Sequence, residues 1–81
     1  MRMPFGQIFA EHPDHQFSPI SKPVRIGERV VYSGTMLRAD HPILGRRICD
    51  LAGRDLEVEN VVVVDGEPPT EVHAFAVASV Y

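Results

Sequence analysis

The sequence has little of what usually stabilises a small domain covalently. Its one cysteine, Cys49, excludes a disulfide within the chain and a cysteine-rich zinc site. No stretch approaches the roughly 18 consecutive apolar residues of a membrane-spanning helix. The first residues also lack the continuous apolar segment of a secretory signal. We therefore expect a cytoplasmic protein, or a component of a virus particle, which would have the same features.

The sequence also lacks recognisable motifs for chemistry. The glycines occur singly and not at phosphate-binding spacing. The net charge is −3 and aromatic residues do not alternate with the arginines, so a nucleic-acid partner is not expected. Cys49 and the pair Asp40-His41 are interpreted as a small buried residue and a helix cap. We predict no catalytic residue and no cofactor.

The chain is long enough for only one domain. A domain of 81 residues buries only about 60–65% of its extended-chain surface, so its stability is marginal without support. With a disulfide excluded and a cysteine-based metal site ruled out, association with other subunits is the remaining common support. We expect a homo-oligomer or a larger protein assembly.

Charge is distributed unevenly along the chain. Residues 22–54 contain seven basic and three acidic residues, a balance of +4, whereas residues 55–81 contain six acids and no lysine or arginine. The two parts can neutralise each other within one subunit, which is the more common arrangement. Alternatively, they provide complementary surfaces on neighbouring subunits.

Residues 1–23 differ in composition from the rest and are predicted to form an N-terminal docking arm, followed by a β-rich domain at 24–81. The segment holds four of the seven prolines and three of the four phenylalanines. Pro4 favours a short helical turn after it, and the remainder is expected to be extended. The large apolar side chains of this arm must pack against its own domain or a neighbour. The candidate contact residues are Phe5, Ile8, Phe9 and Phe17.

The middle of the chain contains weaker signals. Residues 24–33 alternate as a strand region around Gly27-Glu28, and residues 35–39 are a second short strand candidate. Over residues 40–53, Leu44, Ile48 and Leu51 follow helical spacing, which predicts a short helix, although Ile48-Cys49 also suits a strand.

The last third predicts a β-hairpin. Residues 56–64 and 72–80 have period-two alternation and are separated by Asp65-Gly66-Glu67-Pro68-Pro69, which is rich in turn formers. An amphipathic helix over 70–80 is the alternative. Both strands become apolar on two faces, which requires covering layers on both sides. The small side chains Ala74, Ala76 and Ala78 are therefore added to the candidate contact residues.

Two histidines provide the alternative hypothesis of a metal site. His12 and His15 flank Pro13-Asp14, and imidazoles with carboxylates are ligands for zinc and related metals. A zinc site needs three or four ligands, so a more distant residue such as His41 would have to complete it. The chain would then be a small metal-dependent enzyme or accessory subunit.

The sequence as a whole predicts a mainly β protein, with α+β as the variant. The expected architecture is a small antiparallel barrel or a two-layer sheet with an extended N-terminal arm and at most one or two short helices. The expected function is non-enzymatic: a structural or interaction module in a homo-oligomer or larger assembly.

Overall fold

The computed structural model describes all 81 residues and is mainly β, as predicted. The principal sheet has five strands in the order β1-β8-β9-β4-β5. Their bounds are Arg2–Pro4 (β1), Val24–Ile26 (β4), Arg29–Val31 (β5), Asp55–Asp65 (β8) and Thr70–Val80 (β9). All neighbours pair antiparallel except β4 and β9, which are parallel. The outer edges of β1 and β5 have no strand partner, so the sheet is open and mixed and does not close into a barrel.

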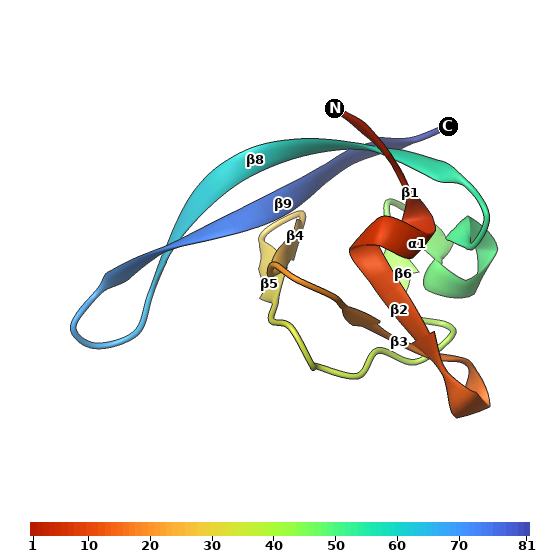
Figure 1. The fold of residues 1–81 in the computed structure, drawn as a ribbon, viewed down its shortest axis with the longest axis horizontal. Helices are drawn as coiled ribbons and strands as arrows, with labels where there is room; N and C mark the ends of the chain where they lie inside the picture. Colours follow the sequence, from red (N-terminus) through yellow and green to blue (C-terminus); the bar gives the residue numbers. More distant parts are fainter.

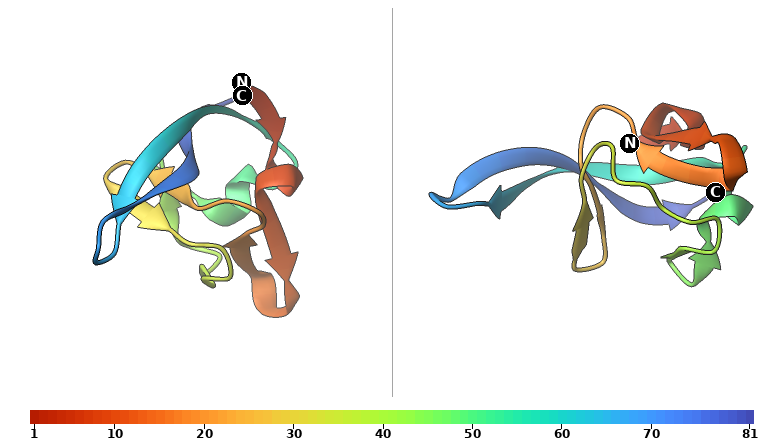
Figure 2. Two further views of the ribbon diagram at one scale, coloured as in Figure 1. Left: turned by 60° about the vertical axis from the view of Figure 1, so that its left-hand side comes forward. Right: turned by 90° about the horizontal axis from the view of Figure 1, so that it is seen from below.

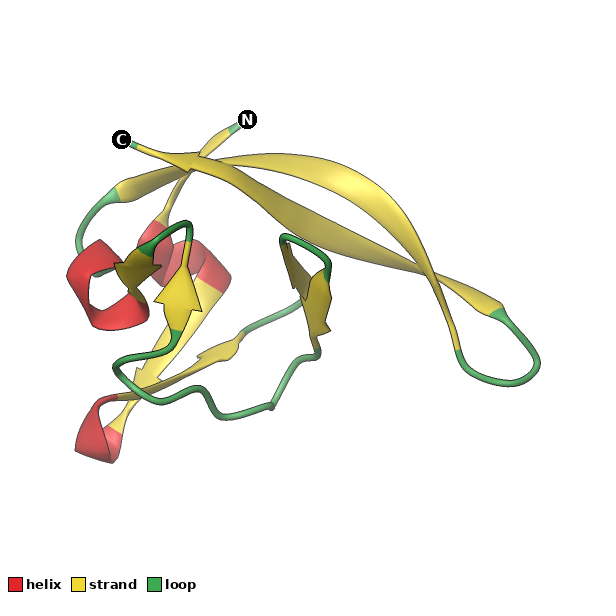
Figure 3. Cartoon of the chain, turned by 180° about the vertical axis from the view of Figure 1, so that it is seen from behind, coloured by secondary structure: helices red, strands yellow, loops and turns green.

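A second layer of small elements lies beneath this sheet (Figure 1). It contains two short hairpins and three single-turn helices. Their bounds are Phe5–Ile8 (α1), Phe9–His12 (β2), Pro13–His15 (η1), Gln16–Pro19 (β3), Pro42–Ile43 (β6), Arg46–Arg47 (β7) and Ile48–Leu51 (η2). The hairpins are β2–β3 and β6–β7, and Figure 3 shows both on the same side of the long β8–β9 ribbon.

Residues 1–23 pack against their own subunit, which is one of the two surfaces that the sequence left open for the docking arm. β1 pairs with residues 55–57 of β8, and the amide of Ile20 donates to the carbonyl of Ile8 at 3.0 Å. Phe5 stacks on Phe9 with ring centroids 5.1 Å apart and contacts Phe17 edge-on at 5.5 Å. These rings join one core with residues from the sheet and from η2, and burial there removes them from water.

The core lies between the sheet and the second layer. Fourteen buried apolar side chains form it. Leu56 and Val58 of β8 meet Val77 of β9 on the inner face of the sheet, while Ile48 and Leu51 of η2 close the core from below. The short helix predicted after Pro4 is present as α1, and it directs both Phe5 and Ile8 into the core.

Residues 40–53 do not form the predicted helix. Pro42–Ile43 and Arg46–Arg47 pair as a tiny hairpin, and only Ile48–Leu51 is helical. Leu44 and Gly45 have φ of 53° and 76°, which is the backbone geometry of a tight two-residue hairpin turn. Ile43, Ile48 and Leu51 are buried, whereas Leu44, which the predicted helix would place on its apolar face, is exposed in the turn.

The strand predicted at 35–39 is also absent. Only Leu37 is paired, through an isolated bridge in which its amide and carbonyl bond to Phe17. By contrast, the strand region around Gly27-Glu28 is the β4–β5 hairpin, and the predicted C-terminal hairpin is β8–β9 with its turn at residues 66–69. The helical alternative for residues 70–80 is therefore wrong.

Candidate functional site

The far end of the β8–β9 hairpin projects from the body of the molecule (Figures 1 and 2). β1 and Met1 bond to β8 only as far as Val58, and β4 and Pro23 bond to β9 only from Phe75 onward. Residues 59–74, which we call the projecting hairpin, therefore pair only within the β8–β9 hairpin. Both of its outer backbone edges are free, and free strand edges are natural sites for association.

The inner face of the projecting hairpin is uncovered and carries two valines beside polar residues. Cross-strand pairing places Val62 opposite His73 and Val64 opposite Glu71. By the two-residue repeat of a strand, Val62 and Val64 continue the face on which Val58 enters the core. Phe75, opposite Asn60, still joins the core, but beyond that pair Val62 and Val64 are 50% and 68% exposed. The sheet therefore presents more apolar face than the second layer covers.

The projecting hairpin is also acidic. It carries four carboxylates and no lysine or arginine; the acids are Glu59, Asp65, Glu67 and Glu71. At neutral pH these charges surround the exposed valines with negative potential. The hairpin therefore presents exposed valines among carboxylates, which favours contact with a basic surface over contact with a second hairpin.

Charge does not neutralise through ion pairs between the two parts of the sequence. Of the five ion pairs, none joins a basic residue of 22–54 to an acid of 55–81. Arg38 pairs with Asp40 at 3.8 Å and Arg47 with Asp50 at 3.1 Å, both within the basic part. Arg25, Arg29 and Arg46 have no ion-pair partner. The acidic hairpin and the basic segment thus remain available to other molecules.

A groove of about 440 Å³ follows the free edge of β5. Its lining consists of Arg29, Val30, Val31, Tyr32, Thr35, Leu37 and His41. Successive side chains of a strand point to opposite faces, so four consecutive residues can line one groove only along the edge of the strand. At that edge the backbone amides and carbonyls of β5 have no strand partner. The groove is thus largely apolar, with one free guanidinium.

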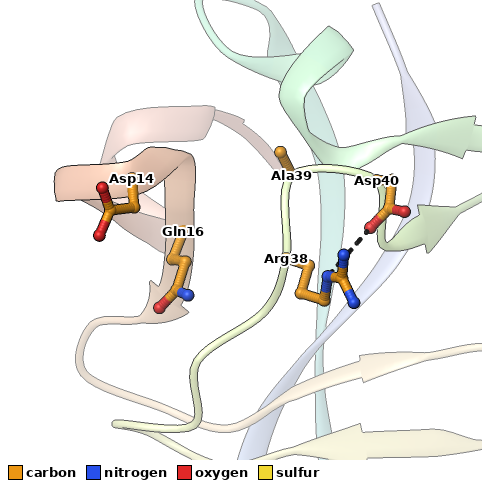
Figure 4. A pocket seen from close by; sticks show the side chains of 5 residues that line it. All are labelled: Asp14, Gln16, Arg38, Ala39 and Asp40. Atoms are coloured by element: carbon orange, nitrogen blue, oxygen red, sulfur yellow. Dashed lines mark ion pairs between the residues drawn. The ribbon is translucent and has the colours of Figure 1, made fainter.

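The second surface hollow, of about 550 Å³, is polar and lies between two loops (Figure 4). Asp14 and Gln16 approach from the β2–β3 hairpin, and Arg38, Ala39 and Asp40 from the loop opposite. The Arg38 and Asp40 side chains are both largely exposed, and their ion pair is the only interaction among these residues. Exposed groups already paired with each other do not form a preorganised binding or catalytic site.

The predicted histidine pair is not assembled into a metal site. Nε2 of His12 is 2.7 Å from the hydroxyl of Ser18, while the exposed ring of His15 is 3.9 Å from Glu11. No group of three histidine, cysteine or acidic side chains is arranged to hold a metal ion. Cys49 packs, partly buried, against the core. The metal-enzyme alternative thus has no assembled ligand set.

The four apolar residues proposed as partner contacts are used inside the subunit. Phe5, Ile8, Phe9 and Phe17 are at most 4% exposed. Within one subunit they therefore leave little surface for a partner. A sequence identifies side chains that must be buried, but the hydrophobic effect does not specify which surface buries them.

The three alanines have different environments. Ala74 and Ala76 are buried, and Ala76 lies between Glu59 of β8 and Arg25 of β4 in the register of the sheet. Longer neighbours thus cover it without a further layer. Ala78 is exposed at a bulge, since the register shifts after the pair Glu57–Ser79 to Val58–Val77. Val62, Val64 and the edge of β5 remain uncovered. The sequence pattern did not distinguish these positions from apolar residues that are buried.

Comparisons with known proteins return no match: no family model, curated protein or solved structure is similar to this chain. No helix of the structure is long and apolar enough to cross a membrane. The function must therefore be argued from the surfaces described above.

Proposed function

We propose that the protein is a non-enzymatic structural subunit that associates with other protein chains through its projecting hairpin, in a homo-oligomer or a larger particle. The observation that carries this proposal is the exposure of Val62 and Val64. They lie on the same sheet face as Val58, which is buried in the core. Exposed valines are stabilised when another surface covers them.

Two further features support association over catalysis. The projecting hairpin has free backbone edges, and an exposed edge rich in β-branched residues is a template for strand addition. The acids and bases of the chain are segregated, and no ion pair connects the two groups. Complementary charged surfaces accelerate and orient association between subunits.

The test compares the molar mass of the wild-type chain with that of the double variant Val62→Thr/Val64→Thr, by light scattering over a range of concentrations. Threonine preserves the branched shape and strand preference of valine, so the hairpin is retained. We expect association to weaken about tenfold or more, since burial of each valine contributes ~1.5 kcal/mol.

Ile20→Thr is the matched control. Ile20 is as exposed as Val62 but lies in the loop after β3, away from the hairpin. Its replacement is expected to leave association unchanged. Equal molar masses for the wild-type and double-variant chains at every concentration would refute the role of the hairpin.

A further inference from the structure

We infer that the projecting hairpin of one copy binds the groove along β5 of a second copy, where the free edge of its β8 adds to the free edge of β5. This inference rests on the proposed function and specifies the partner and the surface. It pairs the most apolar exposed edge of the chain with a groove that is open along a strand.

The backbone supplies the first reason. Glu59–Asp65 of β8 is extended beyond the last residue paired with β1, so its outer amides and carbonyls are unpartnered. The outer edge of β5 is in the same state. Addition of one edge to the other converts both into paired backbone and continues the sheet across the two copies.

Side chains and charge supply the second reason. The groove has the valines and Leu37 as apolar lining, which suits the branched side chains of Val61–Val64. Arg29 lines it without an ion-pair partner, and the hairpin brings Glu59 at one end of its valine run. A guanidinium that meets a carboxylate at this position orients the incoming strand.

Charge also disfavours the obvious competitor, pairing of two β8 edges. In such an antiparallel arrangement the valine runs would face each other, and their flanking acids Glu59 and Asp65 would be brought together without a basic residue. Like charges directly opposite in a sheet are destabilising. The contact proposed here joins two different surfaces, so repeated copies build a ring or a filament unless the pair closes on itself.

Cross-linking between two tagged proteins tests the inference. Both carry Cys49→Ser; one adds Val64→Cys on the hairpin, and the other adds Thr35→Cys in the groove. The mixture is treated with a short thiol-to-thiol cross-linker. We expect a heterodimer of the two tagged chains. Ala52→Cys replaces Thr35→Cys in the control mixture, because Ala52 is exposed but lies outside the groove; this mixture is expected to give no heterodimer.

A charge variant provides the second measurement. Arg29→Glu is expected to weaken self-association about tenfold, whereas Arg46→Glu, an exposed arginine outside the groove, is expected to leave it unchanged. If the chain associates but Val64→Cys links only to itself or equally to both partners, the groove is not the binding surface and the proposed function stands. If the chain is monomeric at all concentrations, both proposals fall.

Discussion

The hydroxyl of Tyr81 donates a hydrogen bond to Oε2 of Glu57 at 3.0 Å, so the last residue is fastened to the strand that β1 also joins. The other carboxylate oxygen of Glu57 accepts from the ammonium of Met1 at 3.1 Å. The guanidinium of Arg2 lies 4.2 Å from the Tyr81 ring centroid and bonds Asp55 at 2.7 Å. This cluster holds both ends of the chain against Asp55 and Glu57, at the start of β8. The turn of the projecting hairpin lies at the opposite end of this strand.

Glu57 is expected to give the fold part of its acid sensitivity. Hydrogen bonds from the Met1 ammonium and from Tyr81 hold the pKa of Glu57 below its ordinary value. A carboxyl whose pKa is lowered by folding stabilises the protein above its unfolded pKa, and this contribution is lost as pH falls through the folded pKa. Glu57→Gln is therefore expected to lower the urea midpoint at neutral pH and to have little effect in strong acid.

Glu59→Gln is the matched control for that experiment, since Glu59 is on the same strand and has neither an ion pair nor a hydrogen bond through its side chain. Urea unfolding followed by circular dichroism at several pH values makes the comparison. Identical pH dependence of the two variants would show that the cluster around Glu57 contributes nothing.

The N-terminal phenylalanines are expected to be essential for folding. Phe9 is 1% exposed, and its replacement by alanine removes a large buried ring at a typical cost of about 3–5 kcal/mol. A domain of this length has a total stability of roughly 4–12 kcal/mol. Thermal unfolding of Phe9→Ala is expected to show a large loss or no folded state, while Ile20→Ala on the surface of the same segment changes little. A cooperative transition for Phe9→Ala at the wild-type temperature would show that the Phe9 ring contributes little to the core.

The turn of the β6–β7 hairpin contains a residue poorly suited to its backbone. Leu44 has φ of 53° and is 45% exposed; an L-residue with a large side chain is disfavoured in this region by roughly 1 kcal/mol, whereas asparagine tolerates it. Leu44→Asn is expected to raise the free energy of unfolding by up to about 1 kcal/mol. Leu44→Ala, which lacks the side-chain amide by which asparagine hydrogen-bonds the local backbone at positive φ, serves as the control. Equal stability of the two variants in urea would contradict this account.

The tip of the projecting hairpin is expected to influence the titration of Tyr32. A hydrogen bond with the Asp65 carboxylate raises the pKa of the Tyr32 hydroxyl above its ordinary value. A group whose pKa is raised by folding stabilises the protein below its unfolded pKa, about 10 for tyrosine, and loses this contribution as pH rises. In an NMR titration of the two tyrosines, Asp65→Asn is expected to lower the pKa of Tyr32 and leave that of Tyr81 in place. An unchanged pKa of Tyr32 would mean that the Asp65 carboxylate does not lie beside the Tyr32 hydroxyl.

The sequence predicted the elements whose partners are close in the chain. The β8–β9 hairpin follows from alternation on both sides of a proline- and glycine-containing turn, and the β4–β5 hairpin from alternation around Gly27. The parallel pairing of Val24 with Phe75 was not predictable in the same way, because it joins distant residues through backbone bonds that no side-chain pattern specifies. At residues 40–53, tertiary packing of Ile43 and Ile48 overrode the helical spacing.

The candidate site was predictable only in part. The doubly apolar run Val61–Val64 indicated a surplus of apolar strand, and that surplus persists as the exposed Val62 and Val64. Which apolar residues the subunit would bury for itself depended on the path of residues 1–23. Those residues fill the core with Phe5, Phe9 and Phe17. The uncovered valines therefore lie elsewhere, on the projecting hairpin.

Sedimentation of the wild-type chain over a wide concentration range tests the central claim most directly. We expect a mass that rises above the 9.0 kDa of one chain as concentration increases, and a weaker rise at high salt because screening reduces attraction between the acidic hairpin and Arg29 of the groove. A single 9.0 kDa species at every concentration and salt would contradict it.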